Sequence, residues 1–373
     1  MINLLKQKYQ PQEQPRDPKE KPVIDTGVPF GGKHIPFLSV CIPTYNRSEM
    51  LPAAIESVLE QDFDDFELII CDNASTDNTE EVVRKYSDDR RLRYVRYKNL
   101  VSMYANHNRC VDSARAGWIV FLHSDDKLVP HALHTVKDLI NRSDPRTSVI
   151  VSQANHIKER LNSWGAPWDK EQDLCYPEAL DLFIISGGLS PSGTAYRKVK
   201  SFDTIAQFYE QTITSDHLYL MRELLEYNII KWSGTKTVER LRHVNASSTV
   251  ATRYGINWHS GYSLTYKQVS NHNNFQNYMG HLKGVFPSWP QEYQIIFLTR
   301  LAQANCTKTV KEFEKIANFK ALIRSRAYGH VFLLKMNYTF YWKLLTFYKS
   351  LKFYFQHFAL FFGLNKGGNK KYE

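Results

Sequence analysis

The feature that most constrains the fold is a regular alternation of strand-like and helix-like segments between residues 37 and 126. The segments follow in the order 37–46 (strand), 48–61 (helix, with Ser48 as its expected cap), 66–73 (strand), 75–88 (helix), 92–99 (strand), 103–117 (helix) and 118–126 (strand). Such an alternation favours a parallel sheet with helices on its faces. We therefore predict an α/β fold with a mixed, mainly parallel, Rossmann-like sheet flanked by helices.

Polar residues follow three of these strands, at the edge where sheets of this kind bind ligands. The segments are PTYNR (43–47), CDNASTDNT (71–79) and HSDD (123–126). No GxGxxG or GxxxxGK[ST] sequence follows any strand, which argues against the two common phosphate-binding loops. The acids remain: Asp72 can accept the N3–H of a pyrimidine base, and Asp125 can hold a divalent cation that neutralises a diphosphate. This combination predicts a nucleotide-sugar ligand.

The stretch HSDDKL places two acids directly after the apolar run WIVFL, where an unpaired carboxylate is costly. One explanation is a helix cap, with Asp126 capping a helix that begins near residues 128–130 and Pro130 in its first turn. The other explanation is a cation site, because a bound cation compensates buried carboxylates. The rest of the chain favours the cation site.

Composition and charge narrow the remaining classes. The chain has 373 residues, of which 43% are hydrophobic and 23% charged, so it can bury a large core and is not a disordered protein. Its formal net charge of +10 predicts an anionic partner: nucleic acid, a phosphate-bearing small molecule or an acidic membrane surface. Five cysteines without CxxC pairs suggest a reducing compartment. Residues 1–35 have no signal-peptide or membrane-anchor pattern and are predicted to be a flexible lead-in.

Three motifs together carry a resemblance to a known family. VCIPTYNR, IICDNASTDNT and WIVFLHSDD, in this order and spacing, resemble the family 2 glycosyltransferases, which have the GT-A fold. A weaker similarity extends to about residue 250. The resemblance implies a glycosyltransferase enzyme that uses a nucleoside-diphosphate sugar, with a UDP-sugar favoured. It also implies a catalytic domain over residues 36–255, with a nucleotide-binding half (36–130) and an acceptor half (131–255).

The resemblance assigns nucleotide-sugar binding to residues in all three motifs, and these residues are Pro43, Tyr45, Asn46, Arg47, Asp72, Asn73, Ser124 and Asp125. The first segment would border the nucleotide, Asp72 would contact the base, and Asp125 would hold Mn²⁺ or Mg²⁺ on the diphosphate. His123 departs from the family, which usually has an acid at this position. Its imidazole is expected to be either a group beside the metal or sugar, or a structural histidine.

A catalytic base is also implied by the resemblance, because the family places an Asp at the start of a helix after the sheet. Here TSDHLYLMRELLEYN places Asp216 at the head of a helical segment, with Ser215 where the family usually has Glu. We predict that Asp216 takes the proton of the acceptor hydroxyl in an inverting transfer. The alternative is an N-terminal acid that only favours the helix dipole.

Two loops flank this helix. The preceding one contains Gly187, Gly188 and Gly193, which allow the backbone to approach an acceptor closely or simply form a turn. The following one, VERLRH, resembles the basic loop of the family that closes over the diphosphate. Arg240 and Arg242 would supply charge there and His243 a metal ligand, whereas the alternative is a solvated basic loop. No QxxRW motif follows, and since that motif accompanies processive synthesis in this family, we predict the addition of a single sugar.

Residues 256–373 are predicted to form a helical C-terminal extension. Within it, segment 341–364 is rich in aromatic residues and lysines, and its longest uncharged run, 353–365, is too short to span a bilayer. We predict that this segment lies on an anionic membrane surface, while the alternative is a protein interface, such as one between copies of this chain. Together with the resemblance, this predicts a cytoplasmic enzyme, peripheral on the inner face of the cell membrane. Its acceptor would be a glycan or polyprenyl-linked glycan of surface polysaccharide or lipopolysaccharide O-antigen biosynthesis, and nucleic acid is not expected as a partner.

Two other functions compete with this prediction. A nucleotidyltransferase would share the sheet and the metal-binding acids, but it should have a Gly-rich signature with Arg and Lys after the first strand, and PTYNRSEML lacks one. A non-catalytic glycan-binding or scaffold protein with a decayed site is favoured by His123 and by Ser215. Donor hydrolysis in the presence of a metal separates the enzyme from the scaffold.

Overall fold

The structure is a computed structural model, and the residues that it describes are 17, 19–151, 170–186, 191–198, 215–240, 266–289, 294, 297–298, 312–313 and 315–316. The chain divides into two compact units, Met1–Arg242 with Lys267–His281 and His243–Tyr266 with Leu282–Glu373. The first unit contains the sheets and every described residue of the candidate site. The predicted domain boundary at residue 255 lies outside the described residues.

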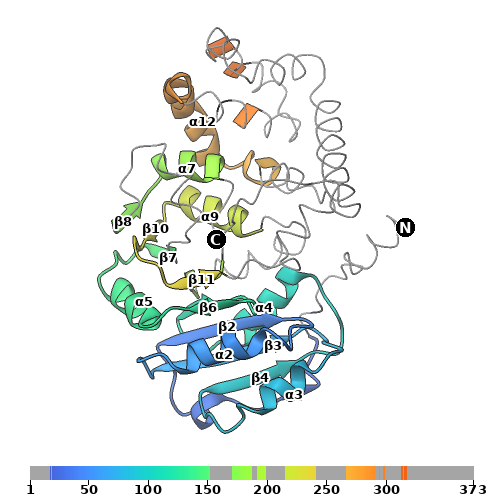
Figure 1. Cartoon of the computed structure of the whole chain (residues 1–373). Coiled ribbons are helices and arrows are strands. Elements are labelled where there is room, and N and C mark those ends of the chain that lie inside the picture. Colours follow the sequence, from blue (N-terminus) through green and yellow to red (C-terminus); the bar gives the residue numbers. More distant parts are fainter. Residues whose placement is uncertain are drawn as a thin grey trace, which may run out of the picture. The chain divides into compact units, whose positions relative to one another are not determined.

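Within the described residues, the main sheet has nine strands in the order β1-β4-β3-β2-β5-β9-β7-β10-β8 (Figure 1). They are β1 (Ile24–Asp25), β2 (Leu38–Thr44), β3 (Phe66–Asp72), β4 (Leu92–Arg96), β5 (Trp118–Phe121), β7 (Thr147–Val151), β8 (Gln172–Leu174), β9 (Ala195–Arg197) and β10 (Ile229–Trp232). β2 is parallel to both β3 and β5, and β4 is parallel to β3. β9 is antiparallel to its neighbours β5 and β7. A separate two-stranded sheet joins β6 (Asp126–Leu128) to β11 (Val238–Arg240).

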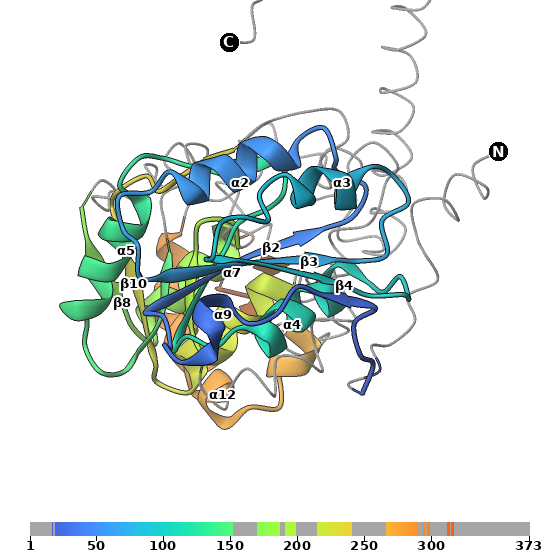
Figure 2. The same cartoon turned by 90° about the horizontal axis from the view of Figure 1, so that it is seen from below.

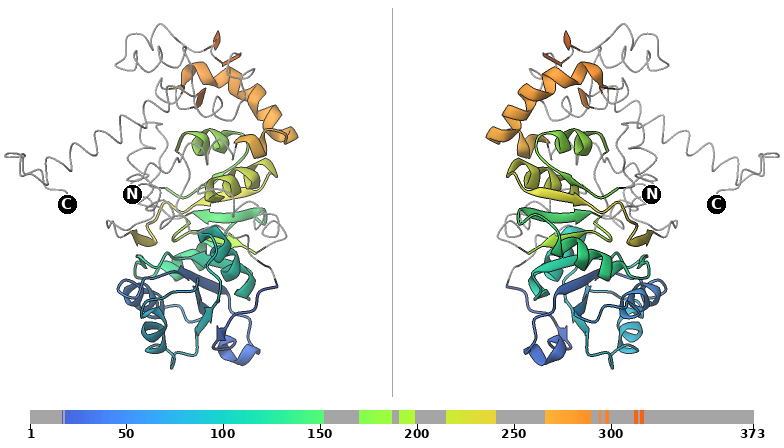
Figure 3. Two further views of the ribbon diagram at one scale, coloured as in Figure 1. Left: turned by 90° about the vertical axis from the view of Figure 1, so that its right-hand side faces the viewer. Right: turned by 90° about the vertical axis from the view of Figure 1, so that its left-hand side faces the viewer.

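Helices cover both faces of the nucleotide half of the sheet. The described helices are α2 (Leu51–Leu59), α3 (Thr79–Arg84), α4 (Met103–Ser113), α5 (Ala132–Asn141), α7 (Glu178–Ser186), α9 (Ser215–Leu225) and α12 (Asn273–Val285), with 3-10 turns at Pro29–Gly32 and Phe286–Ser288. Figure 2 shows α2 and α3 on one face of β2, β3 and β4, and α4 on the opposite face. α9 contacts both α7 and β10, as Figure 3 shows. The predicted α/β fold, a mixed and mainly parallel sheet flanked by helices, is confirmed.

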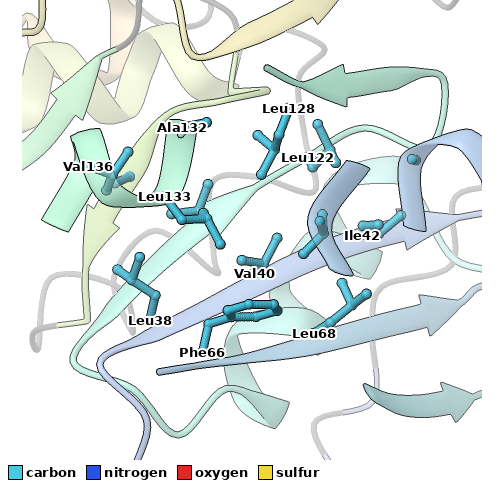
Figure 4. Close-up of a cluster of buried hydrophobic side chains, with 14 of the residues drawn as sticks. Leu38, Val40, Ile42, Phe66, Leu68, Leu122, Leu128, Ala132, Leu133 and Val136 are labelled. Carbon is cyan, nitrogen blue, oxygen red and sulfur yellow. The ribbon is translucent and has the colours of Figure 1, made fainter. Parts of the chain in front are cut away.

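The core lies between the central strands and the helices α2 and α5 (Figure 4). Leu38, Val40 and Ile42 of β2 are fully buried there, and Leu133 and Val136 of α5 pack in the same cluster. Every residue of β3 is buried, including its polar ones. This near-continuous burial is typical of parallel strands covered on both faces, and each large apolar side chain contributes about 1.5–3 kcal/mol. The core therefore fixes the strand ends that carry the motifs.

The predicted helix cap at Ser48 is wrong, and the alternative explanation of Asp126 as a cap does not hold either. Ser48 does not cap α2, which begins at Leu51 after an uncapped Met50, and the Ser48 amide instead donates to Asp77 Oδ2 at 3.0 Å. Asp126 does not cap a helix either, because it begins strand β6. α5 begins at Ala132, after His131 with a φ of 63°. The cap explanation of the paired acids is therefore excluded.

Part of the predicted flexible lead-in is ordered. β1 pairs antiparallel with β4, so residues 24 and 25 form an edge strand of the main sheet, while residues 1–16 and 18 lie outside the described residues. In the second unit, the rings of Phe286, Trp289, Phe297 and Phe313 pack together with centroid distances of 4.9–5.8 Å. Segment 341–364 also lies outside the described residues. In the part of the chain that is described, no helix has the length and hydrophobicity needed to cross a membrane.

Candidate active site

The loops that follow β2 and β3 are joined by hydrogen bonds. Asn46 has a φ of 51°, a left-handed conformation that Asn tolerates better than most residues. Its amide donates to Ser75 Oγ at 2.9 Å, and its Oδ1 accepts from the Thr76 amide at 2.8 Å. The Arg47 amide donates to Thr79 Oγ1 at 3.4 Å. The first two motifs therefore form one bonded wall at the carboxyl edge of the sheet.

Two predicted nucleotide-binding residues in this wall differ in exposure. Tyr45 is 39% exposed, so part of its ring is accessible beside the end of β2. Pro43 is partly buried within β2, opposite Cys71 of β3. Both residues lie at the strand edge where the sequence predicts the nucleotide.

The Asp72 carboxylate is fully buried and bonded to protein groups. Its Oδ1 accepts from the Ser75 amide at 2.8 Å, its Oδ2 accepts from the Tyr94 hydroxyl at 2.5 Å, and Arg96 Nε lies 3.7 Å from Oδ2. Burial and this carboxylate raise the pKa of Tyr94 well above its usual range. Because the carboxylate is fully buried, a base could reach Asp72 only if neighbouring groups moved, so the predicted base contact stays a prediction.

The side chain of Asn73 is also buried and hydrogen-bonded within the protein. It is 4% exposed, its Nδ2 donates to the Val101 carbonyl at 2.8 Å, and its Oδ1 accepts from the Val101 amide at 2.9 Å. These two bonds mimic a strand pair and join the end of β3 to the segment before α4. The side chain thus shapes the predicted nucleotide pocket.

A cluster of possible metal ligands follows β5. One ring nitrogen of His123 and one carboxylate oxygen each of Asp125 and Asp126 lie within 4.8 Å of one another, the single such group of three among the described residues. The Asp126 amide donates to the His123 carbonyl at 3.0 Å, which closes the turn, and the His123 amide donates to Ser192 Oγ at 3.1 Å. Ser124, between them, is 7% exposed. The structure therefore brings His123 into the predicted metal site beside Asp125.

Burial acts oppositely on the two ionisable neighbours in this cluster. It raises the pKa of Asp126 and lowers the pKa of His123, because it disfavours both charged forms. Nδ1 of His123 lies 3.9 Å from Asp126 Oδ2, while its buried Nε2 has no hydrogen-bond partner. Two carboxylates suit a hard cation such as Mn²⁺, which also accepts an imidazole nitrogen, and the residues present thus fit a divalent metal.

Asp216 lies in the first turn of α9 and is partly buried. The hydroxyl of Tyr104, on α4, donates to Asp216 Oδ1 at 3.3 Å. Burial raises the pKa of Asp216 from 3.8 to about 6, and the Tyr104 bond and the charge of Arg240 oppose this rise. The carboxylate is therefore a stronger base than an ordinary Asp and can still be ionised near neutral pH.

Arg240 connects the base to the acid cluster. It ends β11, which pairs with β6 so that Arg240 lies opposite Asp126. Its positive charge lowers the pKa of both Asp126 and Asp216, so the guanidinium acts on both carboxyls. Arg242 and His243 lie outside the described residues. A cation whose charge acts on both acids suits a ligand diphosphate.

One of the predicted acceptor glycines lies next to this site. Gly193 has a φ of 78°, which favours glycine, and its amide donates to the Phe121 carbonyl at 2.7 Å. The adjacent Ser192 accepts a hydrogen bond from the His123 amide. Gly187 and Gly188 lie outside the described residues. Only Gly193 can therefore be placed, close to the His123 turn.

Sequence reasoning missed a buried layer beneath the site, formed by Tyr104 and His107 of α4. The His107 ring centroid lies 5.4 Å from that of Tyr104 and 5.7 Å from that of His123. Burial and the neighbouring His123 lower the pKa of His107 to about 3, so it is neutral. The spacing of three residues places both rings on one helix face, but no local signal indicates that Tyr104 meets an acid 112 positions later.

Comparison with known proteins agrees with the motifs. Residues 39–202 match the model of glycosyl transferase family 2. The chain is 32% identical over 141 residues to a GalNAc(5)-diNAcBac-PP-undecaprenol beta-1,3-glucosyltransferase of Campylobacter jejuni, covering 37% of this chain and 46% of that protein. It is 26% identical over 178 residues to a PGL/p-HBAD biosynthesis glycosyltransferase of Mycobacterium bovis, covering 45% of this chain and 68% of that protein. The chain thus spans less than half the length of the first of these relatives.

Among solved structures, S. aureus TarS 1-349 in complex with UDP-GlcNAc is similar with a TM-score of 0.49 and 16% identity, covering 75% of this chain and 90% of that chain. The mannosyltransferase PcManGT from Pyrobaculum calidifontis, in complex with GDP-Man and Mn²⁺, has a TM-score of 0.48 and 14% identity, with 91% of each chain covered. The family match and the named relatives confirm the resemblance inferred from the sequence, and they support the predicted enzyme class, glycosyltransferase.

Proposed function

We propose that this chain, whose residues 39–202 match glycosyl transferase family 2, transfers one sugar from a nucleoside-diphosphate sugar to a glycan or lipid-linked glycan, with inversion at the anomeric carbon. The observation that carries the proposal is the position of Arg240, opposite Asp126 in the pairing of β11 with β6. Its charge acts both on the acid cluster after β5 and on Asp216 at the head of α9. One site can thereby bind a diphosphate and hold a base.

The chemistry follows from these groups. Asp216 takes the proton of the acceptor hydroxyl while that oxygen forms a bond to the anomeric carbon. The bond from this carbon to the diphosphate oxygen breaks, and the nucleoside diphosphate leaves with the electron pair. Arg240 offsets the negative charge that develops on the leaving group. Attack from the face opposite the diphosphate produces inversion.

A divalent cation, Mn²⁺ or Mg²⁺, belongs to this proposal. Asp125 is the proposed direct ligand, with His123 and Asp126 beside it and His243 as a further candidate from the sequence. When bound, the cation would neutralise the diphosphate as a Lewis acid. The nitrogen donor of His123 favours Mn²⁺ over Mg²⁺, because Mg²⁺ prefers oxygen ligands.

The donor is proposed to bind at the wall formed by the loops after β2 and β3. Pro43, Tyr45, Asn46 and Arg47 border it there. A UDP-sugar is favoured, because the acid that ends β3 suits the N3–H of uracil, although neighbouring groups would have to move for the base to reach this buried carboxylate. Asn73 and Ser124 then support the pocket walls from buried positions. Gly187, Gly188 and Gly193 are proposed on the acceptor side, and Arg242 beside the diphosphate.

The acceptor is proposed to be carried on a lipid in surface polysaccharide synthesis. One relative's name specifies an undecaprenol-linked oligosaccharide, and another specifies PGL biosynthesis. The lysines and aromatic residues of segment 341–364 suit attachment to the anionic cytoplasmic face of a membrane. We therefore propose a peripheral enzyme that reaches its acceptor at the bilayer surface and adds a single residue.

A second candidate is a non-catalytic glycan-binding or scaffold protein. Two departures from the family pattern favour it: His123 in place of an acid, and Ser215 in place of Glu. Against it stands the raised pKa of Asp216, since burial of an acid beside a cationic site is typical of functional positions.

A donor screen tests the proposed function. UDP- and GDP-sugars are compared for thermal stabilisation with Mn²⁺, because a ligand that binds the native state raises the apparent stability. Release of the nucleoside diphosphate is then measured for the wild type and for Asp216→Asn. Metal-dependent release by the wild type, lost in the variant, is the expected result. Stabilisation without release by either protein would favour the scaffold.

A further inference from the structure

Glu20 forms a buried ion pair with Arg109 of helix α4. Glu20 Oε2 lies 2.5 Å from Arg109 NH2, and the two side chains are 12% and 2% exposed. Glu20 belongs to a segment that we call the N-terminal strap, residues 19–28, which precedes the family match at residues 39–202. Removing one partner of a buried pair leaves an uncompensated charge, which is costly. The strap therefore supplies the counter-ion of a buried cation in the nucleotide half.

Arg109 connects its ion pair with Glu20 to the residues at the end of β3. Its NH1 donates to Asn73 Oδ1 at 2.9 Å, its NH2 donates to the Asn99 carbonyl at 3.1 Å, and its guanidinium lies 4.1 Å from the centroid of the Tyr97 ring. Asn73 holds Val101 through the two hydrogen bonds described above. A single network thus joins the strap to the loop after β3 and to segment 97–102.

The strap has a second anchor in this segment. The amide and Nδ2 of Asn99 both donate to Glu20 Oε1, at 3.3 and 3.0 Å. Further along the strap, Asp25 pairs with Arg93 at 2.7 Å, but none of the hydrogen bonds of Arg93 goes to Asn73 or segment 97–102. Of these two ion pairs of the strap, the Glu20–Arg109 pair is connected to Asn73 by a hydrogen bond, and the Asp25–Arg93 pair is not.

We propose that Glu20 is a positioning residue for the nucleoside-diphosphate part of the donor. This inference rests on the proposed function, because it assumes that the nucleotide binds at the wall formed by the loops after β2 and β3, where Asn73 lies. With the Glu20 charge in place, Arg109 stays beside Asn73 and keeps Val101 against the end of β3. Without it, the buried guanidinium turns toward water and the pocket wall loosens. The hydrogen bonds of this network join Glu20 and Arg109 to Asn73, Asn99 and Val101. We therefore expect the base Asp216 and the turn at Asp125 to keep their geometry.

Glu20→Gln tests the proposal with a neutral side chain of the same shape, and Asp25→Asn is the matched control on the same strap. Glu20→Gln should raise the donor KM and the Kd for UDP about tenfold, the usual scale for a coupled position outside the site. Its kcat should stay within about twofold, since transition-state groups are untouched. Asp25→Asn should leave all three constants near the wild-type values. Glu20→Asp keeps the charge and should recover part of the affinity.

Amide hydrogen exchange supplies a readout that needs no donor. Segment 97–102 should exchange faster in Glu20→Gln and at the wild-type rate in Asp25→Asn. Equal effects of the two variants, or unchanged exchange and affinity in Glu20→Gln, would overturn the proposal. If Glu20→Gln does not fold, the donor KM and the amide exchange of segment 97–102 are measured in Glu20→Asp instead. Wild-type values of both in Glu20→Asp would then overturn the proposal. A wild type that binds neither UDP nor GDP refutes the proposed function, whereas the exchange result concerns the network alone.

Discussion

The hydroxyl of Tyr104 donates a hydrogen bond to Asp216 Oδ1 at 3.3 Å and so joins helix α4 to the head of α9. The same helix face presents His107 to the ring of His123, next to Asp125. α4 therefore contacts both the proposed base and the proposed metal turn from below. Because the two contacts start one helical turn apart on a rigid element, the distance between base and metal turn is fixed by the fold.

Replacing Asp216 by Asn should remove turnover and leave binding intact. Asn keeps the shape but cannot accept the proton, so kcat should fall about a hundredfold or more, the usual scale for a lost general base. The Kd for the donor should be little changed. Asp181→Asn is a matched control, because Asp181 also has a pKa raised by burial to about 6 and a tyrosine partner, Tyr278 at 2.6 Å. Equal loss of donor binding in Asp216→Asn would contradict its role as the base.

The pH dependence of transfer should report the environment of Asp216. Its pKa of about 6 predicts that kcat falls as pH drops through 6, because the protonated acid cannot act as a base. The Tyr104 bond stabilises the ionised form and lowers this pKa. Tyr104→Phe should therefore move the acid limb to higher pH, by up to about one unit, with little change of kcat at pH 8 to 9. The charge of Arg240 still opposes the rise, and Tyr196 also lies near this acid.

Tyr86→Phe controls for the loss of a phenol, since the Tyr86 hydroxyl donates to Glu56 Oε1 at 2.8 Å, in a pair that contains no proposed site residue. Its pH profile should match that of the wild type. An acid limb that does not move in Tyr104→Phe would show that the Tyr104 bond does not tune the base.

The two acids after β5 should respond differently to loss of charge. Asp125→Asn should abolish transfer and the metal dependence of donor binding, because it removes the proposed direct ligand. Asp126→Asn should reduce transfer less than Asp125→Asn does, because Asp126 is not the proposed direct ligand. Asp126 is 3% exposed, and the substitution keeps its backbone hydrogen bonds in β6. Calorimetric titration of Mn²⁺ in the presence of UDP measures metal binding in both variants, and thermal unfolding verifies their fold. Near-normal metal-dependent activity in Asp125→Asn would contradict the assignment.

The sequence predicts those parts of the site whose residues are consecutive in the chain or lie at the ends of predicted strands. Asp72 ends one buried strand and Asp125 follows another, and because parallel strands end at one edge, the sequence predicts that both acids lie at that edge. The failures involve partners distant in the chain. Ser48 looked like a helix cap, but its amide bonds to Asp77, 29 residues away. Asp126 begins a strand only because Val238–Arg240 pairs with it.

Distant contacts also explain what the sequence did not indicate at all. Glu20 meets Arg109 across 89 positions, and Tyr104 meets Asp216 across 112. Each residue alone has an ordinary local role, an acid in a charged segment or an aromatic residue on a helix. Only the packing of α4 against the strap and against α9 gives them a partner.

The last prediction concerns segment 341–364, which lies outside the described residues and depends on the sequence alone. Its Lys343, Lys349 and Lys352 stand among aromatic residues, and each basic residue near an anionic bilayer contributes about 1 kcal/mol. Removing residues 341–373 should release the protein from anionic vesicles, and high salt should partly mimic the deletion by screening. Replacing the three lysines by Gln is the matched control: it should weaken binding to anionic vesicles while keeping the aromatic residues that insert at the interface.

Truncation should separate the two halves of the reaction. Donor hydrolysis should persist in the truncated chain, because every proposed catalytic residue lies before residue 250, whereas transfer to a lipid-linked acceptor should fall. Vesicle flotation, nucleotide release and transfer to a polyprenyl-linked acceptor measure the three effects on one preparation. If truncation leaves vesicle binding unchanged and dissociates an oligomer, the aromatic segment belongs to a protein interface, because its removal then breaks contacts between copies of the chain and not contacts with lipid.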